Sequence, residues 1–133
     1  MADDPMSPSL LLHDVLGLSV TEIDPDRVVI IWTVAEQHLQ PHGLAHGGMH
    51  SLVNESAASI AGGSWLGADG RCVGVNNSTD FLRAARPGDE LTATATPVHR
   101  GRSQQLWLVE TRDARDRLVA RGQVRLQNLP ARA

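Results

Sequence analysis

The chain has 133 residues, of which 41% are hydrophobic and 20% are charged, and these values are typical of one folded domain of ordinary composition. Its net charge of -3 argues against general nucleic-acid binding, and its three Trp and one Phe residues offer no platform on which bases could stack. The single cysteine, Cys72, excludes an internal disulfide and a metal site built from cysteines.

The N-terminal segment 1–9 is predicted to be flexible, because its two prolines disfavour a helix. It carries two acidic residues and lacks the basic region of a signal peptide. A short helical turn is expected over 10–16. No apolar run approaches the ~18 residues that a membrane helix needs. We therefore expect a cytoplasmic protein without membrane contact.

Two strands are expected next, at 18–23 and 27–35, joined by the turn Asp24-Pro25-Asp26. The run 28–32 is apolar throughout, which indicates a strand that is covered on both faces. A loop rich in His, Pro and Gly follows over 36–45.

The clearest helical period in the chain begins after this loop. Apolar and small residues recur there at i, i+3, i+4 and i+7, which predicts one buried stripe. Its members are Met49, Leu52, Val53, Ser56, Ala57, Ile60 and Ala61. Gly62 and Gly63 are expected to end the helix.

Four further strands are expected at 72–83, 90–100, 103–112 and 118–127. The segment 90–100 alternates Leu or Ala with Thr, which indicates a half-buried strand of an antiparallel sheet. One long helix among about six antiparallel strands predicts an α+β fold in which the sheet wraps the helix.

Glu55 is predicted to lie on the face of the helix away from the core. Its neighbours there are small (Ser51, Ala58, Ser59 and Gly62), and no Arg lies three or four positions away to pair with it. This pattern indicates that a ligand or a second subunit packs against Glu55. An ordinary exposed carboxylate is the alternative.

The segment 45–55 combines two chemical elements of a carbonyl-activating site. Its glycines bring backbone N–H groups to a helix N-terminus, where partial positive charge gathers. Glu55 supplies a carboxylate that can act as a nucleophile or general base. Gly47 and Glu55 are eight residues apart, or roughly 12 Å along a helix. Both can act on one carbonyl only if two antiparallel helices share sites across a twofold axis, so the hypothesis requires a homodimer.

Three other motifs in the sequence could carry chemistry. His42, His46 and His50 have the spacing of a metal site, but glycines interrupt the segment, so no metal is expected. His46 is expected mainly to orient the glycine turn by hydrogen bonding, with a general-acid role as the weaker alternative. A serine nucleophile at Ser64 is disfavoured because the final glycine of G-x-S-x-G is absent. The turn 99–103 is either a solvated hairpin end or an Arg clamp for phosphate.

Four segments together resemble the hotdog-fold acyl-CoA thioesterases. They are 40–48 (QPHGLAHGG), 55–59 (ESAAS), 80–89 (DFLRAARPGD) and 100–103 (RGRS). The closest likeness is to the PaaI-like and 4-hydroxybenzoyl-CoA thioesterase branch with a catalytic glutamate, whose relatives act on 1,4-dihydroxy-2-naphthoyl-CoA and phenylacetyl-CoA. The resemblance implies a single hotdog domain over 10–129 with a short tail at 130–133, and a homotetramer built from dimers.

The resemblance also implies catalytic roles for individual residues. The Gly47 N–H would polarise the thioester carbonyl, and Glu55 would be the nucleophile or general base. Ser59 would position the carboxylate or the attacking water. Gln40 and His46 would line the site beside the glycine, contributed by the subunit opposite Glu55.

The predicted substrate is an aromatic acyl-CoA, with coenzyme A as part of the substrate and no separate cofactor. Gly48 and Phe81 would contact this substrate, and Arg100, Arg102 and Ser103 would hold the coenzyme A phosphates. Two alternatives remain open, hydrolysis of thioesters on an acyl-carrier protein and non-catalytic binding of acyl-CoA. The identity of the acyl group stays open as well.

Overall fold

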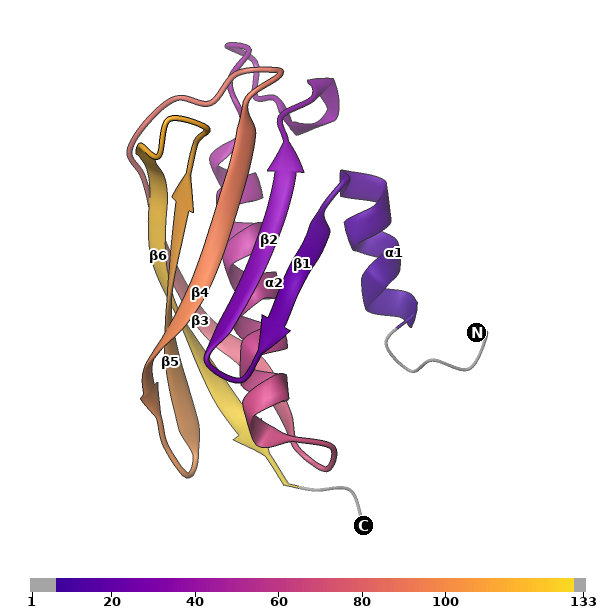
Figure 1. The fold of residues 1–133 in the computed structure, drawn as a ribbon, viewed down its shortest axis with the longest axis vertical. Coiled ribbons are helices and arrows are strands. Elements are labelled where there is room, and N and C mark those ends of the chain that lie inside the picture. Colours follow the sequence, from indigo (N-terminus) through magenta and orange to yellow (C-terminus); the bar gives the residue numbers. More distant parts are fainter. Residues whose placement is uncertain (1–6, 131–133) are drawn as a thin grey trace.

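A six-stranded antiparallel sheet curves around one long helix in the computed structural model, which describes residues 7–130 (Figure 1). The strand order is β1-β2-β4-β5-β6-β3. The strands are β1 (Ser19–Asp24), β2 (Arg27–Thr33), β3 (Arg71–Phe81), β4 (Glu90–Arg100), β5 (Gln104–Arg112) and β6 (Leu118–Leu129). The helices are α1 (Ser7–Leu16), the short 3-10 helix η1 (Glu36–His38) and α2 (Gly47–Leu66). This arrangement confirms the predicted α+β fold with a long central helix wrapped by the sheet.

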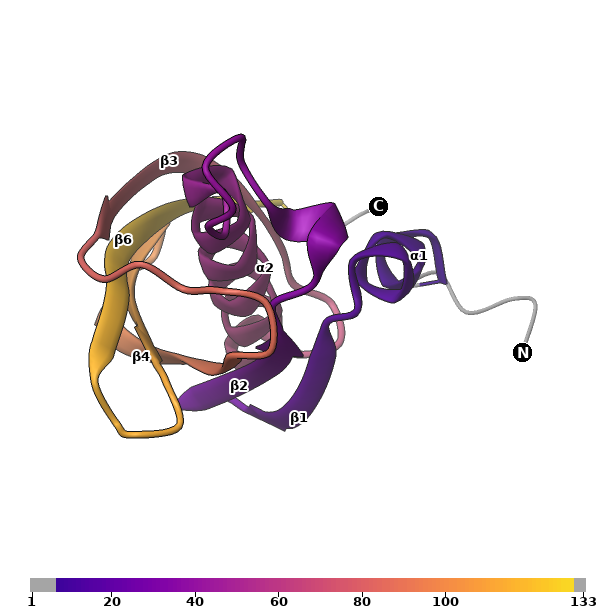
Figure 2. The same ribbon diagram turned by 90° about the horizontal axis from the view of Figure 1, so that it is seen from above.

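The core lies between α2 and the concave face of the sheet (Figure 2). Leu91, Ala93 and Ala95 of β4 are fully buried there, whereas the threonines that alternate with them are half-buried on the outer face. Two large side chains, Trp32 and Trp107, fill the space that these small residues leave. The small residues of β4 let the helix lie close to the sheet, and the tryptophans complete the packing.

Helix α2 continues beyond the two glycines that were expected to end it. It runs to Leu66 and ends at Gly67, whose φ of 84° lies in the left-handed region that favours glycine. Gly62 has a packing role instead. A Cβ at Gly62 would overlap Leu126 Cδ1 and lie 2.9 Å from the side-chain oxygen of Gln105. This glycine therefore lets the helix pack closely against β6 and does not break the helix.

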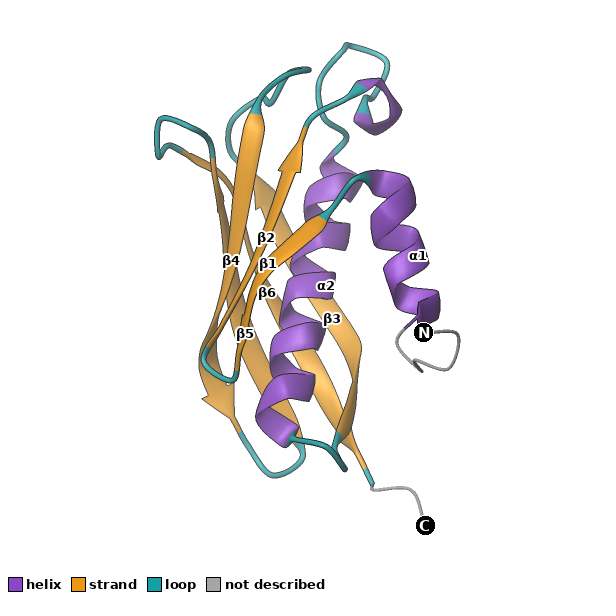
Figure 3. Ribbon diagram, turned by 45° about the vertical axis from the view of Figure 1, so that its right-hand side comes forward, coloured by secondary structure: helices purple, strands orange, loops and turns teal. Residues whose placement is uncertain are grey.

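The buried face of α2 is rotated from the predicted stripe by about one residue, or roughly 100°. Its buried residues are Met49, His50, Val53, Asn54, Ala57, Ala58, Ala61 and Gly62. Leu52, Ser56 and Ile60 are only half-buried. The sheet curves around one side of the helix, and α1 lies along another, where His13 Nε2 is 3.1 Å from Ser56 Oγ (Figure 3).

Helix α1 begins at Ser7, three residues before the helical turn that the sequence predicted over 10–16. Pro8 lies in the first turn, where its missing N–H costs the helix nothing because that turn has no acceptor for it. Residues 1–6 and 131–133, which include most of the expected tail, lie outside the described residues. Within residues 7–130, no helix has the length and apolar character needed to cross a membrane.

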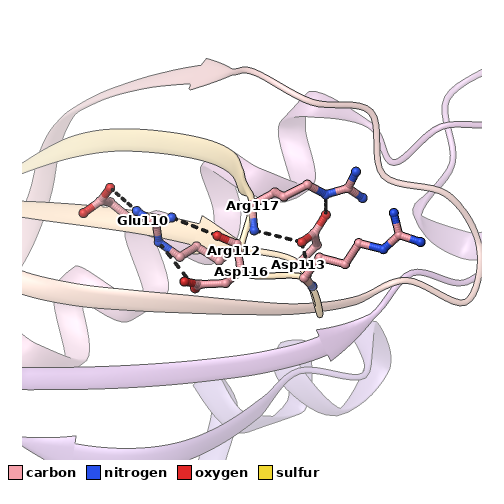
Figure 4. A network of polar contacts seen from close by, with 6 residues as sticks. Glu110, Arg112, Asp113, Asp116 and Arg117 are labelled. Carbon is pink, nitrogen blue, oxygen red and sulfur yellow. Dashed lines mark hydrogen bonds and ion pairs between the residues drawn. The ribbon is translucent and has the colours of Figure 1, made fainter.

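The β5–β6 hairpin closes through a network of charged side chains (Figure 4). The Asp113 carboxylate accepts hydrogen bonds from the backbone N–H groups of Arg115 and Arg117, both at 3.0 Å, and from Arg117 Nε at 2.8 Å. The bond from the Arg117 backbone is the main reason why the pKa of Asp113 lies below its ordinary value. This hairpin lies at the same end of the molecule as the N-terminus of α2 (Figure 1).

Gly62→Ala should lower the free energy of unfolding by about 1–3 kcal/mol, because the added methyl group overlaps Leu126. Gly63→Ala is the matched control. A Cβ at Gly63 meets nothing within 4 Å, so the higher helix propensity of alanine should stabilise that variant by up to about 1 kcal/mol. Urea unfolding at one protein concentration measures both changes, and equal effects of the two substitutions would contradict the packing role of Gly62.

Candidate active site

The N-terminus of α2 presents one backbone donor that has no acceptor within residues 7–130. His46 is the N-cap, and its Nδ1 accepts a hydrogen bond from the Gly48 N–H at 2.8 Å. Its carbonyl accepts the Met49 N–H at 2.9 Å. The Gly47 N–H is left without a partner among these described residues. The donor predicted to polarise a carbonyl is therefore available, whereas the Gly48 N–H is already used by His46.

Phe81, at the end of β3, packs directly on Gly47. A Cβ at Gly47 would lie 2.5 Å from Phe81 Cε2, so any side chain at this position would collide with the ring. A pocket of about 280 Å³ opens beside the two residues, between α2 and the segments 40–45 and 81–85. Most of its lining is apolar, which suits an acyl group.

Gln40 lines the same pocket and is held there by a tight turn. Its backbone N–H donates to Leu44 O at 2.8 Å, and its carbonyl accepts the N–H of Gly43, whose φ is 81°. Its side-chain Oε1 accepts a hydrogen bond from the His42 N–H. The structure thus brings together Gln40, Gly47 and Phe81, three of the residues that the sequence predicted for one site.

Glu55 lies two turns further along α2 and is exposed, next to the edge strand β3. A Cβ at Gly74 would lie 3.3 Å from Glu55 Cδ, which places the carboxyl group against this strand. The strand has a bulge at Val75, between the paired residues Gly74 and Asn76. Glu55 makes no ion pair or side-chain hydrogen bond within the part of the chain that the structure describes. Its carboxylate is therefore free to act on a ligand.

Ser59 follows Glu55 by one turn of α2 and is half-buried. Its carbonyl oxygen accepts a weak hydrogen bond from the Cys72 thiol at 3.8 Å. The predicted groove of small residues around Glu55 is narrower than expected, because Ala58 and Gly62 belong to the buried face. Ser51 and Ser59 remain beside Glu55 at half-buried positions.

A polar network that sequence reasoning missed joins the edge strand to the helix before Glu55. Asn77 Nδ2 donates to Ser51 O at 2.8 Å, and Asn77 Oδ1 accepts the Thr79 hydroxyl at 2.7 Å. Asn54 Nδ2 donates to the same hydroxyl oxygen at 3.1 Å. In an α-helix the carbonyl of Ser51 also receives the Glu55 N–H, so the network anchors the turn that carries Glu55. An asparagine within a predicted strand was the available signal, since strands are depleted in Asn.

His50 also lines the pocket, although the sequence analysis considered it only as a metal ligand. It is only 3% exposed, and its ring lies 5.7 Å from the Trp32 ring and 6.1 Å from the Phe81 ring, measured between centroids. Burial lowers the pKa of His50 to about 4, so the imidazole is neutral at neutral pH.

The three histidines considered for a metal site have separate environments. His42 is exposed in the loop, His46 caps the helix and His50 is buried. Within residues 7–130, no group of three His, Cys, Asp or Glu side chains could hold a metal ion.

Arg100 is already engaged in contacts that stabilise the fold. Its Nη1 donates to Asp26 Oδ1 at 2.7 Å and to Pro25 O at 2.9 Å, and its guanidinium lies 5.6 Å and 5.9 Å from the ring centroids of Trp65 and Trp107. These contacts explain its position without a phosphate ligand.

Arg102 and Ser103 are exposed on the β4–β5 turn. This turn lies at the end of the molecule opposite the N-terminus of α2 (Figure 1). Within one chain, the structure therefore does not bring these two residues to the pocket beside Gly47.

Comparisons with known proteins give consistent matches. A family model described as the thioesterase superfamily matches residues 42–120. Rv1847 of Mycobacterium tuberculosis H37Rv, which carries the name of an esterase, is 48% identical over 131 residues, 96% of this chain and 93% of that protein. The 1,4-dihydroxy-2-naphthoyl-CoA hydrolase of Listeria monocytogenes is 29% identical over 81% of this chain and 87% of its own length.

Solved structures give the same result for the fold. The crystal structure of S. sahachiroi AziG has a TM-score of 0.86 and 58% identity, covering 89% of this chain and 95% of that one. The PaaI protein of E. coli, from the phenylacetic acid degradation operon, has a TM-score of 0.87 and 26% identity, covering 95% and 89%.

His50 should make the fold sensitive to acid. An unfolded histidine has a pKa of about 6.5, so between this value and the folded pKa of about 4 the unfolded chain binds more protons. The free energy of unfolding should therefore fall by about 2 kcal/mol between pH 7.5 and pH 5 because of this residue alone. His50→Leu should remove that part of the loss and His99→Leu, at an exposed histidine, should keep it. Urea unfolding at both pH values measures the difference, and equal losses in the two variants would contradict the assignment.

Proposed function

The chain belongs to the thioesterase superfamily, and we propose that it is an acyl-CoA thioesterase that hydrolyses an aromatic acyl thioester to the free acid and coenzyme A. The main support is the Gly47 N–H at the start of α2, which has no acceptor within residues 7–130 and lies beside a largely apolar pocket. Relatives named as hydrolases or thioesterases of 1,4-dihydroxy-2-naphthoyl-CoA support an aromatic acyl group. The acyl group is of the hydroxybenzoyl, dihydroxynaphthoyl or phenylacetyl type.

Two groups carry out the proposed reaction. The Gly47 N–H, aided by the helix dipole, stabilises the negative charge that develops on the carbonyl oxygen, which lowers the barrier by about 3 kcal/mol. Glu55 either attacks the carbonyl carbon and displaces the coenzyme A thiolate to form a mixed anhydride, which water then hydrolyses, or takes a proton from an attacking water. Both routes give the carboxylic acid and free coenzyme A. Ser59 positions the carboxylate or the water.

Gln40 and His46 complete the donor side of the site. Because His46 Nδ1 accepts the Gly48 N–H, the proton of the neutral ring is on Nε2. This N–H and the Gln40 side-chain amide are further donors for the thioester beside Gly47. Protonation of the departing sulfur by His46 is the weaker of its two proposed roles.

Each site combines residues of two chains in this proposal. Gly47 and Glu55 of one helix lie too far apart to reach one carbonyl, but β3 is an edge strand and can pair with a second copy. Residues that face each other across antiparallel strands point to the same side of the sheet. We place a twofold axis through Ser78 and leave the bulged Val75 unpaired. Gly74, which lies beside Glu55, is then opposite the partner's Phe81, which packs on the partner's Gly47.

The exposed edge supports this pairing. Val73 and Val75 of β3 are 44% and 48% exposed in the isolated chain, and Phe81 is 58% exposed. Apolar side chains along an unpaired edge strand favour a partner strand over solvent. Two such dimers form a tetramer in the assembly that the family resemblance implies, and this leaves the shared sites unchanged.

Hydrolysis of a thioester on an acyl-carrier protein is the second candidate. One observation favours it: Arg100 is held by Asp26 and by two tryptophan rings, which removes one of three residues predicted to bind coenzyme A phosphates. The chemistry at Gly47 and Glu55 would be the same with either carrier. A thiol-release assay with the same acyl group on coenzyme A and on a carrier protein discriminates between them.

Glu55→Gln should lower kcat by roughly 10³-fold or more, while binding of an uncleavable thioether analogue stays within a few-fold of wild type. The amide keeps the shape of the side chain but is neither a base nor a useful nucleophile. Glu36→Gln, at an exposed glutamate of η1, is the control and should leave thiol release unchanged. Turnover near the wild-type rate in Glu55→Gln would rule out both roles proposed for this residue.

Ser78→Glu should weaken the dimer and lower activity with it, because the proposed axis places two like charges directly opposite each other. Thr21→Glu, on the other edge strand β1, should leave the dimer intact. Sedimentation measures the assembly, and thiol release at increasing protein concentration should recover the activity of Ser78→Glu. A fully active monomer would be incompatible with shared sites.

A further inference from the structure

We propose that Asn128 of β6 is a positioning residue that holds the β4–β5 turn (residues 101–103) with its backbone N–H groups facing outward, where they bind a phosphate of the thioester's carrier. This inference rests on the proposed function, because it assumes an acyl group carried on a pantetheine arm that ends in phosphate. It goes further because it assigns the binding to backbone donors, and their orientation to a residue outside the turn. The phosphate belongs to coenzyme A or to the phosphopantetheine arm of a carrier protein.

Asn128 contacts all three carbonyl groups of the turn. Its side-chain Nδ2 donates to Gly101 O at 3.0 Å and to Arg102 O at 3.1 Å. Its backbone N–H donates to Ser103 O at 2.8 Å. A single residue therefore directs the carbonyl oxygens of three successive residues toward β6.

The planar peptide bond then determines where the N–H groups of the turn point. The described residues contain no cis peptide bond, and in a trans peptide the C=O and the N–H of the next residue point in opposite directions. Because the carbonyls of Gly101 and Arg102 face Asn128, the N–H groups of Arg102 and Ser103 face away from it. Neither N–H has an acceptor within residues 7–130. Successive free N–H groups in a turn form a concavity that binds anions.

A buried chain of hydrogen bonds fixes the orientation of the Asn128 amide. Trp107 Nε1 donates to Gln105 Oε1 at 2.8 Å, and Gln105 Nε2 donates to Asn128 Oδ1 at 2.8 Å. An indole N–H can only donate, so Gln105 presents its oxygen to Trp107 and its nitrogen to Asn128. The Asn128 nitrogen is thereby directed to the turn. Gln105 and Trp107 are both fully buried, which protects this chain of hydrogen bonds from water.

The side chains of the turn can add to the backbone donors. Arg102 and Ser103 are exposed, and their side chains make no ion pair or hydrogen bond within the part of the chain that the structure describes. A guanidinium and a hydroxyl group are therefore free to bind the same anion. Arg100 differs, because Asp26 and two tryptophan rings already hold it.

The distance from the turn to Glu55 suits a pantetheine arm. Arg100, at the start of the turn, lies 5.6 Å from the centroid of the Trp65 ring. Trp65 follows Glu55 by ten residues, or roughly 15 Å along α2. An extended pantetheine arm spans a distance of this order between its sulfur and its phosphate.

Thioesters with and without a phosphate test the inference. Benzoyl-CoA and benzoyl-pantetheine are assayed by thiol release with wild type, Asn128→Leu and the control Gln123→Leu, at an exposed glutamine of the same strand. Asn128→Leu should lower kcat/KM for benzoyl-CoA by about tenfold or more, mainly through KM, because hydrogen bonds to a charged group are lost. Its kcat/KM for benzoyl-pantetheine should stay within about threefold of wild type. Equal losses with both substrates would reveal a merely structural role and overturn the inference.

Two further variants sharpen this test. Asn128→Ser is smaller and still polar, but its hydroxyl cannot donate to two carbonyls at once, so it carries the same expectation if the leucine variant does not fold. Arg102→Gln removes a side chain of the turn and leaves the backbone donors in place. It should therefore reduce kcat/KM for benzoyl-CoA less than Asn128→Leu does, and a larger loss would overturn the assignment to backbone donors.

The source of the phosphate follows from a third substrate, the benzoyl thioester of a carrier protein. A loss in Asn128→Leu with both carriers assigns the turn to the phosphate that they share, and a loss with benzoyl-CoA alone assigns it to a phosphate found only in coenzyme A. Calorimetry with free coenzyme A and pantetheine needs no turnover. Weaker binding of coenzyme A alone to Asn128→Leu supports the inference even if no thioester is cleaved, in which case the proposed function alone fails. Cleavage with an unchanged ratio of the two rates in Asn128→Leu overturns the inference and leaves the proposed function standing.

Discussion

The rigidity of α2 is the constraint from which the proposed mechanism follows. Gly47 and Glu55 are fixed on one continuous helix, at a separation of roughly 12 Å that no side-chain rotation can close. A backbone donor at a helix N-terminus is well oriented because the helix holds it there, and the same rigidity keeps the carboxylate of that chain away from it. In the proposed dimer, the edge strand β3 brings the glycine of one chain to the carboxylate of the other. It can do so because it contacts both regions of α2 and can pair with its own copy.

The contact between α2 and β3 depends on residues without side chains or with small polar ones. Gly47 admits the ring of Phe81, and Gly74 admits the carboxyl group of Glu55. Between these two points, Asn77 binds the backbone of Ser51. A displacement of β3 relative to α2 would therefore move both halves of the proposed site together. Strand β3 therefore has two roles in the proposal: it forms the dimer interface, and it positions the residues of the shared sites.

The sequence predicted the architecture well because its periodic patterns are strong. Alternation in 90–100 and the helical period after residue 46 depend on local geometry, and both elements are confirmed. The helix end was wrong because glycine was interpreted through backbone propensity alone, whereas Gly62 is required by the approach of Leu126. The buried face was misplaced because His50 and Asn54 are polar, and a hydrophobic pattern counts such residues as exposed. The lining of the pocket by His50 depends on tertiary contacts that no local pattern contains.

The two halves of α2 bury different kinds of side chain. In the second half, Ala57, Ala61 and Gly62 meet the sheet with apolar or minimal surface. In the first half, His50 and Asn54 each have a buried side-chain atom without a partner among the described residues. Buried polar atoms without a partner lower stability, and the described residues hold four more of them outside α2, in His13, Trp32, Arg71 and Thr111. His50 lines the pocket beside Gly47, whereas Met49 and Val53 belong to the core, so the first half of α2 contributes both to the proposed site and to the packing of the fold.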